Sequence, residues 1–263
     1  MRSQMRAAFP ASAGGPEVLT IGERPVPQPG AGQVLIKVVF AGVNRHDCNQ
    51  RQRGAPPAGA TDILGLEVSG EIAARGEGAA KFAIGEQVCA LVNGGGYADY
   101  VVAEEDLALP LPAGLGLREG AALPEALFTA WHNIVDLCGL QRGDVLLVHG
   151  GASGVGVLTI QLGRLLGARV FATAGSDERC AFAERLGAAR CFNYRTQDFA
   201  AGVMEATQGH GADVILDMAG GLYAEKNLKA LARGGRISHL SSGGPAYSAP
   251  LNLIMQKEAR ITG

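Results

Sequence analysis

The chain has 263 residues, of which 47% are apolar, so it can bury a sizeable core and is long enough for two domains of ordinary size. A formal net charge of −2 and an aromatic content of 5% exclude the marked basic excess that is typical of nucleic-acid-binding surfaces. No apolar run is long enough to span a bilayer, and the first residues, MRSQMRAAF, lack the apolar core of a secretory signal. We therefore expect a cytoplasmic protein with no nucleic-acid partner and no membrane partner.

The first part of the chain, from residue 5 to about residue 106, has short strand patterns separated by glycine or proline turns. Closely spaced strands of this kind predict a compact, mainly β domain of barrel type. The strands are predicted at 18–21, 33–40, 67–74, 87–91 and 97–102. Residues 110–138 change character, with predicted helices at 117–123 and 127–137, and connect the first domain to the second.

From Val145 onward, strand and helix patterns alternate, which predicts a parallel sheet with helices on both faces. The strands are predicted at 145–149, 170–174, 191–194, 214–218 and 236–240. The helices are predicted from the glycine turn to 166, and at 178–186, 199–207 and 222–231. Residues 259–263 look like the start of a further strand that has no partner.

The most informative stretch is VLLVHGGASGVG, in which four branched apolar residues precede a glycine-rich turn and an apolar helix. Such a turn presents backbone N–H groups and the positive end of the helix dipole to a diphosphate, and glycines let the ligand approach closely. Ser153 occupies the middle position of the G-x-G-x-x-G template, so the strict form fails, and the β-α-β context supports the interpretation more than the glycines do. The alternative is a purely structural turn. We predict a dinucleotide site at Ser153, Gly154, Val155 and Gly156.

Several longer motifs occur along the chain in a fixed order. They are GGPEVL (14–19), GVNRHDCNQRQ (42–52), ILGLEVSGEI (63–72), GGGYADYVV (94–102), LPEALFTAWHNI (123–134), GDVLLVHGGASGVG (143–156), TAGSDERCAFAERLGA (173–188) and DMAGG (217–221). With them the sequence resembles the medium-chain dehydrogenase/reductase superfamily, and within it the zinc-free quinone oxidoreductases related to zeta-crystallin.

The resemblance implies an α/β fold with two domains. Residues 1–124 would form a GroES-like, mainly β catalytic domain, and residues 125–263 a Rossmann domain with a doubly wound parallel sheet that binds NADPH. The cofactor would lie in the cleft between them. Family members continue beyond the position that matches Gly263, so we expect the C-terminal return segment of the catalytic domain to be absent here. A homodimer is expected from the resemblance alone.

The resemblance also bears on zinc. Metal-dependent relatives have a Cys where this chain has Asn44, and a His where it has Leu66. Neither an amide nor an aliphatic side chain replaces thiolate or imidazole as a zinc ligand. The four-cysteine lobe of a structural zinc site is missing too, because the five cysteines are scattered without C-x-x-C spacing. We therefore expect no metal, and a reaction that needs no Lewis acid.

Cofactor choice is expected to depend on the end of the second strand of the Rossmann domain, where an NAD-specific site has an acidic residue. The family positions that hold the 2′-phosphate of NADPH map onto Gly175, Ser176, Arg179 and Tyr194. The acidic pair Asp177 and Glu178 lies between Ser176 and Arg179 and would weaken the preference for NADPH over NADH. The alternative is that Ser176 only caps the helix and that Arg179 is a solvated surface charge.

At the nicotinamide end, the resemblance implies roles for Asn44, Asp47 and Thr129, which we take as the candidate catalytic residues. It also implies backbone contacts at Gly220, Leu240 and Ser241. The alternative for Asn44 and Asp47 is turn chemistry, since both residue types favour turns. His46, His132 and His149 are interpreted as structural residues.

The predicted function is transfer of hydride from NADPH to a quinone-like acceptor without zinc. Family members usually have a Tyr at the mouth of the acceptor pocket, but here the loop QRQRGAPPAGAT has Ala55 and Pro56 in its place. A ring that could stack on a flat quinone is thus missing from this loop. The alternatives are an enoyl or alkenal reductase on the same scaffold, and a structural or sensor protein that binds NADPH with low activity.

Overall fold

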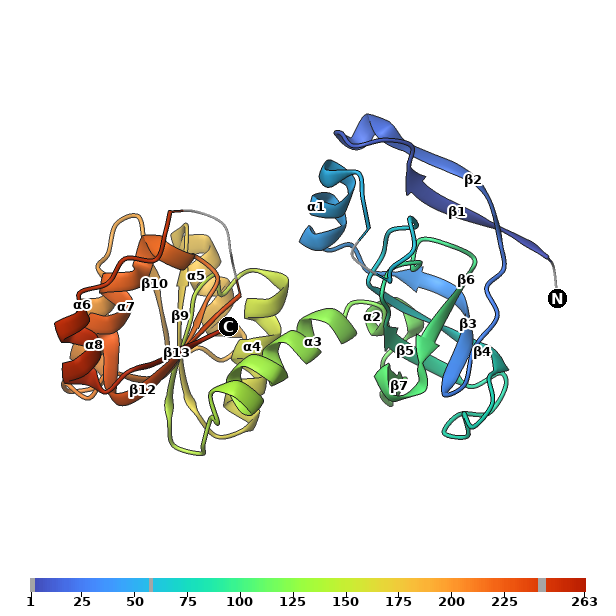
Figure 1. The fold of residues 1–263 in the computed structure, drawn as a ribbon. Coiled ribbons are helices and arrows are strands. Elements are labelled where there is room, and N and C mark those ends of the chain that lie inside the picture. The colour runs from blue at the N-terminus through green and yellow to red at the C-terminus, as the bar shows by residue number, and fades with distance from the viewer. Residues whose placement is uncertain (1–2, 57–58, 241–244) are drawn as a thin grey trace. The chain divides into compact units, whose positions relative to one another are not determined.

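The computed structural model describes residues 3–56, 59–240 and 245–263. The chain divides into two compact units, Met1–Glu125 and Ala126–Gly263, which we call the first and second unit (Figure 1). None of the described helices is both long and apolar enough to cross a membrane. Cys89, Cys138, Cys180 and Cys191 are buried free thiols, and Cys48 is a half-buried one.

The first unit is built on a five-stranded antiparallel sheet with the strand order β6-β3-β4-β5-β7. Inward-facing residues such as Val34, Ile36 and Val68 form its core. A separate hairpin precedes the sheet, and its Ala7 makes an isolated bridge to Ala98. The strands are β1 (Gln4–Pro10), β2 (Leu19–Pro25), β3 (Gln33–Ala41), β4 (Glu67–Arg75), β5 (Gln87–Leu91), β6 (Tyr100–Glu104) and β7 (Ala108–Pro110).

Two helices complete the first unit, α1 (Arg45–Arg53) and α2 (Leu117–Gly120), with 3₁₀ turns at Pro16–Val18 and Glu105–Leu107. The predicted strands at 33–40, 67–74 and 87–91 correspond to β3, β4 and β5. Helix α1 was not predicted because its sequence, RHDCNQRQR, has no apolar stripe. The strand predicted from residue 97 begins at Tyr100, since Ala98 pairs with the hairpin instead.

The second unit has a six-stranded, wholly parallel sheet with the order β10-β9-β8-β11-β12-β13. When the six strands are numbered 1 to 6 along the chain, from β8 to β13, their order in the sheet is 3-2-1-4-5-6. This is the doubly wound arrangement of dinucleotide-binding domains. The predicted fold class is therefore confirmed. The strands are β8 (Val145–Val148), β9 (Arg169–Ala174), β10 (Arg190–Asn193), β11 (Ala212–Asp217), β12 (Leu231–His239) and β13 (Arg260–Thr262).

Helices cover both faces of this sheet (Figure 1). Because successive side chains of a strand point to opposite faces, the strands contribute residues to two separate hydrophobic cores. Leu146 and Val148 pack on one face with α3 and its continuation, α4 and α5, whereas Val145 and Leu147 pack on the other with α6 and α7. The helices are α3 (Pro124–Trp131), α4 (Gly154–Leu165), α5 (Asp177–Arg185), α6 (Phe199–Ala206), α7 (Ala224–Ala230) and α8 (Leu251–Lys257).

Several features of the second unit differ from the sequence predictions. The final strand does have a partner, because β13 pairs with β12 in parallel, with Arg260 opposite Arg236. Helix α8 was not predicted. The helix predicted at 127–137 is α3 followed by a π-helical segment at His132–Leu137, and a 3₁₀ turn at Gly220–Tyr223 precedes α7.

Candidate functional site

The glycine turn after β8 lies where the parallel strands of the second unit end, which we call the carboxyl edge of the sheet. Gly150 has a φ of +64°, in the left-handed region that favours glycine. A β-carbon on Gly156 would lie 2.2 Å from the Gly150 carbonyl oxygen, and one on Gly151 would lie 2.8 Å from Ala172 Cβ. These glycines are therefore required by close packing of the turn.

The beginning of α4 offers the anion-binding groups. Ser153 is the N-cap, and its Oγ accepts a hydrogen bond from Gly156 N at 3.1 Å. The first amides of an α-helix have no carbonyl partner inside the helix, which leaves those of Gly154 and Val155 for an anion. A β-carbon added to Gly154 would have no atom within 4 Å. This open, amide-lined helix start fits the diphosphate of a dinucleotide.

The ends of β9 and β10 bring together the residues predicted for the 2′-phosphate. Tyr194 lies against Gly175, where an added β-carbon would be 2.6 Å from the Tyr194 hydroxyl oxygen. Ser176 caps α5, because its side chain accepts a hydrogen bond from Arg179 N at 3.3 Å. This capping role is the alternative given above for Ser176. The Arg179 side chain is exposed. Of the two acidic residues, Asp177 accepts a hydrogen bond from Asn193 Nδ2 at 2.7 Å, so it is held toward β10.

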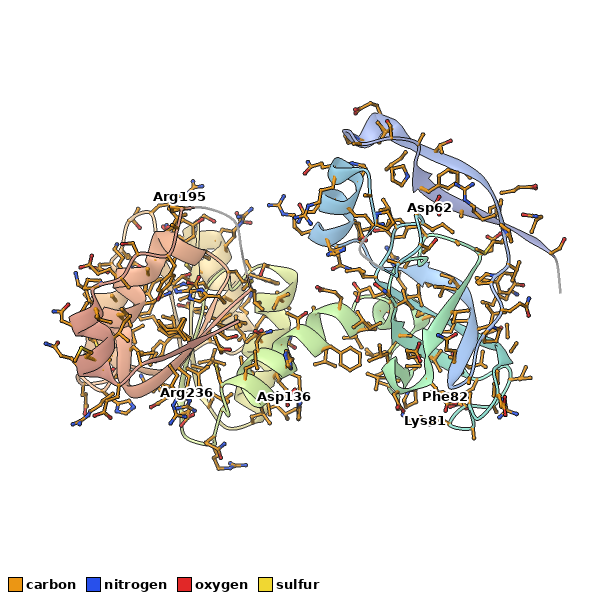
Figure 2. The ribbon with its side chains drawn as sticks, viewed as in Figure 1. Asp62, Lys81, Phe82, Asp136, Arg195 and Arg236 are labelled. Atoms are coloured by element: carbon orange, nitrogen blue, oxygen red, sulfur yellow. The ribbon has the colours of Figure 1, made fainter. Side chains whose placement is uncertain are left out.

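Arg195 is a candidate that sequence reasoning missed. It follows Tyr194 directly, it is exposed, and its backbone N–H is fixed by Asn193 Oδ1 at 3.2 Å (Figure 2). No ion pair of Arg195 or Arg179 occurs within residues 3–56, 59–240 and 245–263. The signal that could have found it is a second basic residue at the end of the third strand of the Rossmann pattern, beside the predicted Tyr194.

Buried polar side chains cluster at the same carboxyl edge. His149 Nε2 lies 2.7 Å from Asn227 Oδ1, and Asn227 Nδ2 donates to Asp217 Oδ2 at 2.9 Å. Asp217 Oδ1 accepts the N–H of Ala219 at 2.6 Å and that of Gly220 at 3.1 Å. Burial acts to raise the pKa of Asp217, but hydrogen bonds from His239 and Ala219 bring it below its ordinary value.

The predicted backbone contacts border this cluster. Gly220 has a φ of +66°, and Leu240 N donates to the Asp217 carbonyl oxygen at 2.9 Å. Ser241 lies outside the described residues. The structure thus brings Gly220 and Leu240 together at the end of β11, next to the turn that follows β8.

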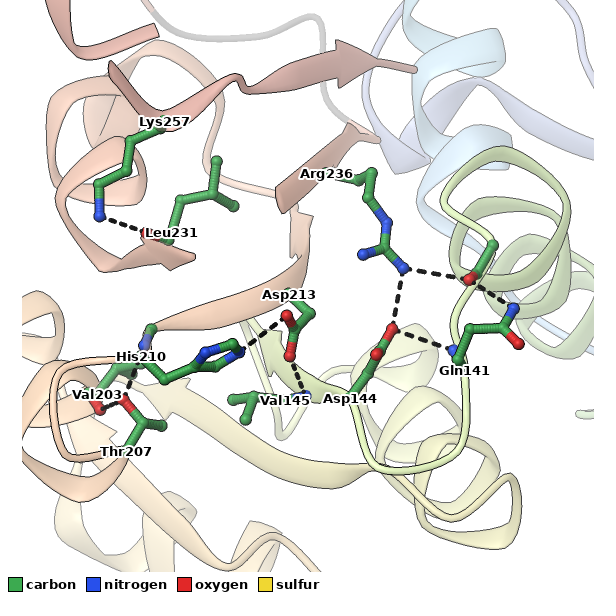
Figure 3. A network of polar contacts seen from close by, with 12 residues as sticks. Gln141, Asp144, Val145, Val203, Thr207, His210, Asp213, Leu231, Arg236 and Lys257 are labelled. Carbon is green, nitrogen blue, oxygen red and sulfur yellow. Dashed lines mark hydrogen bonds and ion pairs between the residues drawn. The ribbon is translucent and has the colours of Figure 1, made fainter. Parts of the chain in front are cut away.

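The opposite edge of the sheet, its amino edge, has a polar network of different character (Figure 3). Asp213 Oδ2 accepts Val145 N at 2.8 Å, and Asp213 Oδ1 lies 2.9 Å from His210 Nε2. Arg236 forms an ion pair with Asp144 at 2.9 Å. These bonds fasten strand beginnings to neighbouring loops, and none involves a residue predicted to bind the cofactor.

In the first unit, Asn44 and Asp47 are brought together at the start of α1. Asn44 N donates to Asp47 Oδ2 at 2.8 Å, and Asn44 Nδ2 donates to Glu67 Oε1 at 2.9 Å. Asp47 is 3% exposed and also accepts the Tyr97 hydroxyl at 2.7 Å and Gly65 N at 3.1 Å. Both side chains therefore fix the local backbone, as the turn interpretation anticipated.

Glu67 is the second buried carboxyl group of this cluster. Burial raises its pKa above the ordinary value and nearby Asp47 adds to this, while hydrogen bonds from Asn44 and from the backbone of Glu125 oppose the change. Burial and the hydrogen bond to Asp47 likewise raise the pKa of Tyr97, so its hydroxyl stays a donor at neutral pH. Leu66 precedes Glu67 and is half-buried. The part of the chain that the structure describes has no group of three His, Cys, Asp or Glu side chains placed to hold a metal ion.

Thr129 belongs to the second unit and lies on α3, near the change to π-helical geometry. Its carbonyl oxygen accepts Asn133 Nδ2 at 2.8 Å, and Asn133 Oδ1 accepts the Ser238 hydroxyl at 2.5 Å. A helix with π geometry often marks a functional position. Asn133 lies in the π-helical segment, and its two hydrogen bonds connect α3 to β12.

A cavity of about 420 Å³ lies elsewhere in the first unit. Its wall includes Arg24, Asp62, Tyr100 and Val102, and neither Asn44 nor Asp47 lines it. It is therefore distinct from the polar cluster around α1.

Comparison with known proteins places the chain in a family. Residues 30–113 match the alcohol dehydrogenase GroES-like domain and residues 154–263 the zinc-binding dehydrogenase family. The chain is 33% identical to a quinone oxidoreductase of Rattus norvegicus over 98% of this chain and 79% of the relative. With the fold and the glycine turn, this shows that the chain belongs to the medium-chain dehydrogenase/reductase superfamily, whose nucleotide-dependent oxidoreductases use NAD(P).

Solved structures agree with this assignment. A crystal structure of an NAD-dependent alcohol dehydrogenase has a TM-score of 0.88 and 35% identity, covering 98% of this chain and 84% of the other. The CurK enoyl reductase has a TM-score of 0.85 and 26% identity, covering 99% of this chain and 80% of the other. The resemblance inferred from the motifs is thus confirmed at the level of the superfamily.

Proposed function

We propose that the protein is an NADPH-dependent quinone reductase that works without zinc. The observation that carries the proposal is likeness to a quinone oxidoreductase over 98% of the chain. The open start of α4, with the amides of Gly154 and Val155, supports a diphosphate-containing cofactor.

The preference for NADPH is supported by charge at the ends of β9 and β10. Gly175 and Ser176 stand where an NAD-specific site has an acidic residue. Arg179, in the first turn of α5, and Arg195, directly after Tyr194, are exposed cations, and guanidinium groups suit a phosphate. Asp177 and Glu178 are both exposed, but the Asp177 carboxylate accepts a hydrogen bond from Asn193, so we expect Glu178 to weaken the preference for NADPH more than Asp177 does.

The absence of a metal from the reaction is supported by the surroundings of Asn44. Its amide donates to Glu67 at 2.9 Å, and a donating amide nitrogen is not a metal ligand. Leu66 offers no ligand atom. An acceptor that needs no Lewis acid, such as a quinone or an activated enone, suits this environment.

The protein groups orient the reactants and exclude water. When bound, NADPH supplies the hydride, which is the cofactor's own chemistry. The amides at the start of α4 bind the diphosphate, and Gly220 and Leu240 are proposed backbone contacts near the nicotinamide. Asn44, Asp47 and Thr129 stay the proposed catalytic residues, with Asp47 acting indirectly by holding the backbone of Gly65 and Asn44 in place. The acceptor's proton comes from solvent.

The loop containing Ala55 and Pro56 has no aromatic ring to stack on a quinone. We infer that the protein binds flat, multi-ring quinones no more tightly than small ones. A second candidate, an enoyl or alkenal reductase, is favoured by the likeness to the CurK enoyl reductase. A homodimer is also proposed, on the ground of the family resemblance; β10 forms one edge of the parallel sheet, where backbone groups can pair with a second copy.

Stopped-flow measurement of NADPH absorbance with quinones, enones and 2-alkenals tests these proposals, alongside calorimetric binding of NADPH and NADH. Faster turnover of quinones supports the first candidate, and faster turnover of 2-alkenals supports the second. Tight NADPH binding without turnover of any acceptor would contradict both and favour a structural or sensor role. Light scattering on the eluted protein reports the oligomeric state.

A further inference from the structure

Four buried polar side chains form a continuous chain across the carboxyl edge of the second unit. Thr173 Oγ1 lies 3.0 Å from His149 Nδ1, His149 Nε2 lies 2.7 Å from Asn227 Oδ1, and Asn227 Nδ2 donates to Asp217 at 2.9 Å. Each of the four is at most 1% exposed. They come from the ends of β8, β9 and β11 and from α7, so the chain joins segments that are far apart in sequence.

The protons of this network have one consistent arrangement. Ionised Asp217 only accepts, so the Asn227 atom that faces it is the nitrogen, and Asn227 Oδ1 must face His149. His149 Nε2 therefore carries a hydrogen. Burial lowers the pKa of His149 below its ordinary value, which keeps the ring neutral, so Nδ1 accepts from the Thr173 hydroxyl.

Each end of the Asn227 bridge holds a loop that belongs to the proposed cofactor site. His149 directly precedes Gly150, the residue with positive φ that starts the glycine turn. Asp217 uses its other oxygen to accept the amides of Ala219 and Gly220. A shift of Asn227 would therefore move both loops, although Asn227 itself is fully buried on α7.

The network ends in an atom without a partner. His239 Nδ1 lies 3.2 Å from Asp217 Oδ2, whereas His239 Nε2 is buried and has no hydrogen-bond partner among the residues that the structure describes. His239 directly precedes Leu240, a proposed cofactor contact. This nitrogen marks the point at which the described part of the network ends.

We propose that Asn227 is a positioning residue for the dinucleotide: by bridging His149 and Asp217, it fixes the glycine turn and the Ala219 and Gly220 amides and thereby sets cofactor affinity. This inference rests on the proposed function, since it assumes that the cofactor is a nicotinamide dinucleotide. It differs from a stabilising role, which would change the melting temperature and leave the affinity of the folded protein unchanged.

The test compares networks at the two edges of the same sheet. Asn227→Ala breaks the bridge at the carboxyl edge, and Asp213→Ala breaks the Val145 and His210 bonds at the amino edge. Thr207→Val, which removes the acceptor of Gly211 N, is a second control away from the carboxyl edge. Melting temperatures and calorimetric Kd values for NADPH are measured at a temperature where circular dichroism shows each variant folded.

We expect all three variants to lower the melting temperature, but only Asn227→Ala to raise the Kd for NADPH, by about tenfold, as for the loss of one buried hydrogen bond. An unchanged Kd in folded Asn227→Ala, or an equal rise in Kd in folded Asp213→Ala, overturns this inference and leaves the proposed function intact. If the wild-type protein binds neither NADPH nor NADH, the proposed function and this inference fail together.

Asn227→Asp keeps the side-chain volume and gives a second readout. Its carboxyl group can replace the amide only while protonated, when it donates to Asp217 and accepts from His149. The titratable groups around it are His149, Asp217 and His239, with Tyr223 against the His149 ring and Tyr247 against the His239 ring. We expect the ratio of variant to wild-type Kd to rise with pH, because two adjacent carboxylates repel. A ratio of one throughout the pH range contradicts the proposal.

Discussion

The Gly150 carbonyl oxygen lies 2.2 Å from the point where a β-carbon on Gly156 would stand. This contact closes the turn between β8 and α4, and no side chain fits between the two backbones. Gly154, two residues earlier, has open space in the same direction, with no atom within 4 Å of an added β-carbon. Two glycines of one motif thus serve different purposes, one for folding and one for the approach of a ligand.

Gly156→Ala is expected to destabilise the second unit by about 1–3 kcal/mol, the usual range for overpacking against fixed atoms. Because the clash is with backbone, the turn must open to relieve it, and NADPH affinity falls as well. Thermal unfolding followed by circular dichroism, together with calorimetry, checks both effects.

Gly154→Ala is the matched control for the glycine turn. We expect its melting temperature to stay the same or rise slightly, since alanine favours a helix over glycine. Its Kd for NADPH should increase, because the new methyl group occupies the space where the diphosphate approaches. Wild-type affinity in this variant would contradict a diphosphate at the start of α4.

Arg179→Ala and Arg195→Ala are each expected to weaken NADPH binding about tenfold or more while leaving NADH binding nearly unchanged. The reason is the loss of a charged hydrogen bond that only a 2′-phosphate can accept. Arg185→Ala, an exposed arginine in the last turn of the same helix α5, is the control and should change neither affinity. An equal loss for both cofactors would contradict recognition of the phosphate.

Tyr97→Phe should lower the free energy of unfolding by about 1–2 kcal/mol, because the buried Asp47 carboxylate loses one of its donors. Tyr100→Phe is the control, since no hydrogen bond of its hydroxyl occurs within the described parts of the chain, and we expect a change within about 0.5 kcal/mol. Denaturant titration measures both. Equal effects would show that the Asp47 bond adds no net stability.

The stabilising contribution of His149 is expected to depend on pH. Its pKa in the folded protein is lowered from the ordinary 6.5, so on acidification the unfolded chain takes up a proton that the folded chain resists. The contribution is fully present above pH 6.5 and is lost as the pH falls from there toward the lowered folded value. The difference in unfolding free energy between wild type and His149→Asn should therefore shrink as pH falls. The same comparison with His132→Asn, an exposed histidine, is the reference.

Incubation with a zinc chelator such as dipicolinate should leave NADPH oxidation by quinones unchanged, since Asn44 and Leu66 supply no ligand atoms. Added zinc should not raise the rate of the chelated protein. Loss of activity that zinc restores would contradict the metal-free reaction.

How far sequence reasoning reached differs between the two units. Strand β8, the glycine turn and α4 follow each other within one continuous stretch, so their pattern identifies them. Helix α1 was not predicted, because its buried residues are the polar Asp47 and Gln50 and it has no apolar stripe. Strand β13 is only three residues long, so its pairing with β12 could not be recognised from its own sequence.

Local sequence patterns predict the alternation of strands and helices, hence the doubly wound sheet, and the position of the amides at the start of α4. Both depend on spacings of a few residues, which local pattern reports directly. The folded arrangement was needed to show that Asp47 contacts Tyr97, 50 positions away, and that His149 contacts Asn227, 78 positions away. Such pairs are set by strand order and helix packing, because a side chain's hydrogen-bond partners depend on which distant segments the fold brings to the same edge.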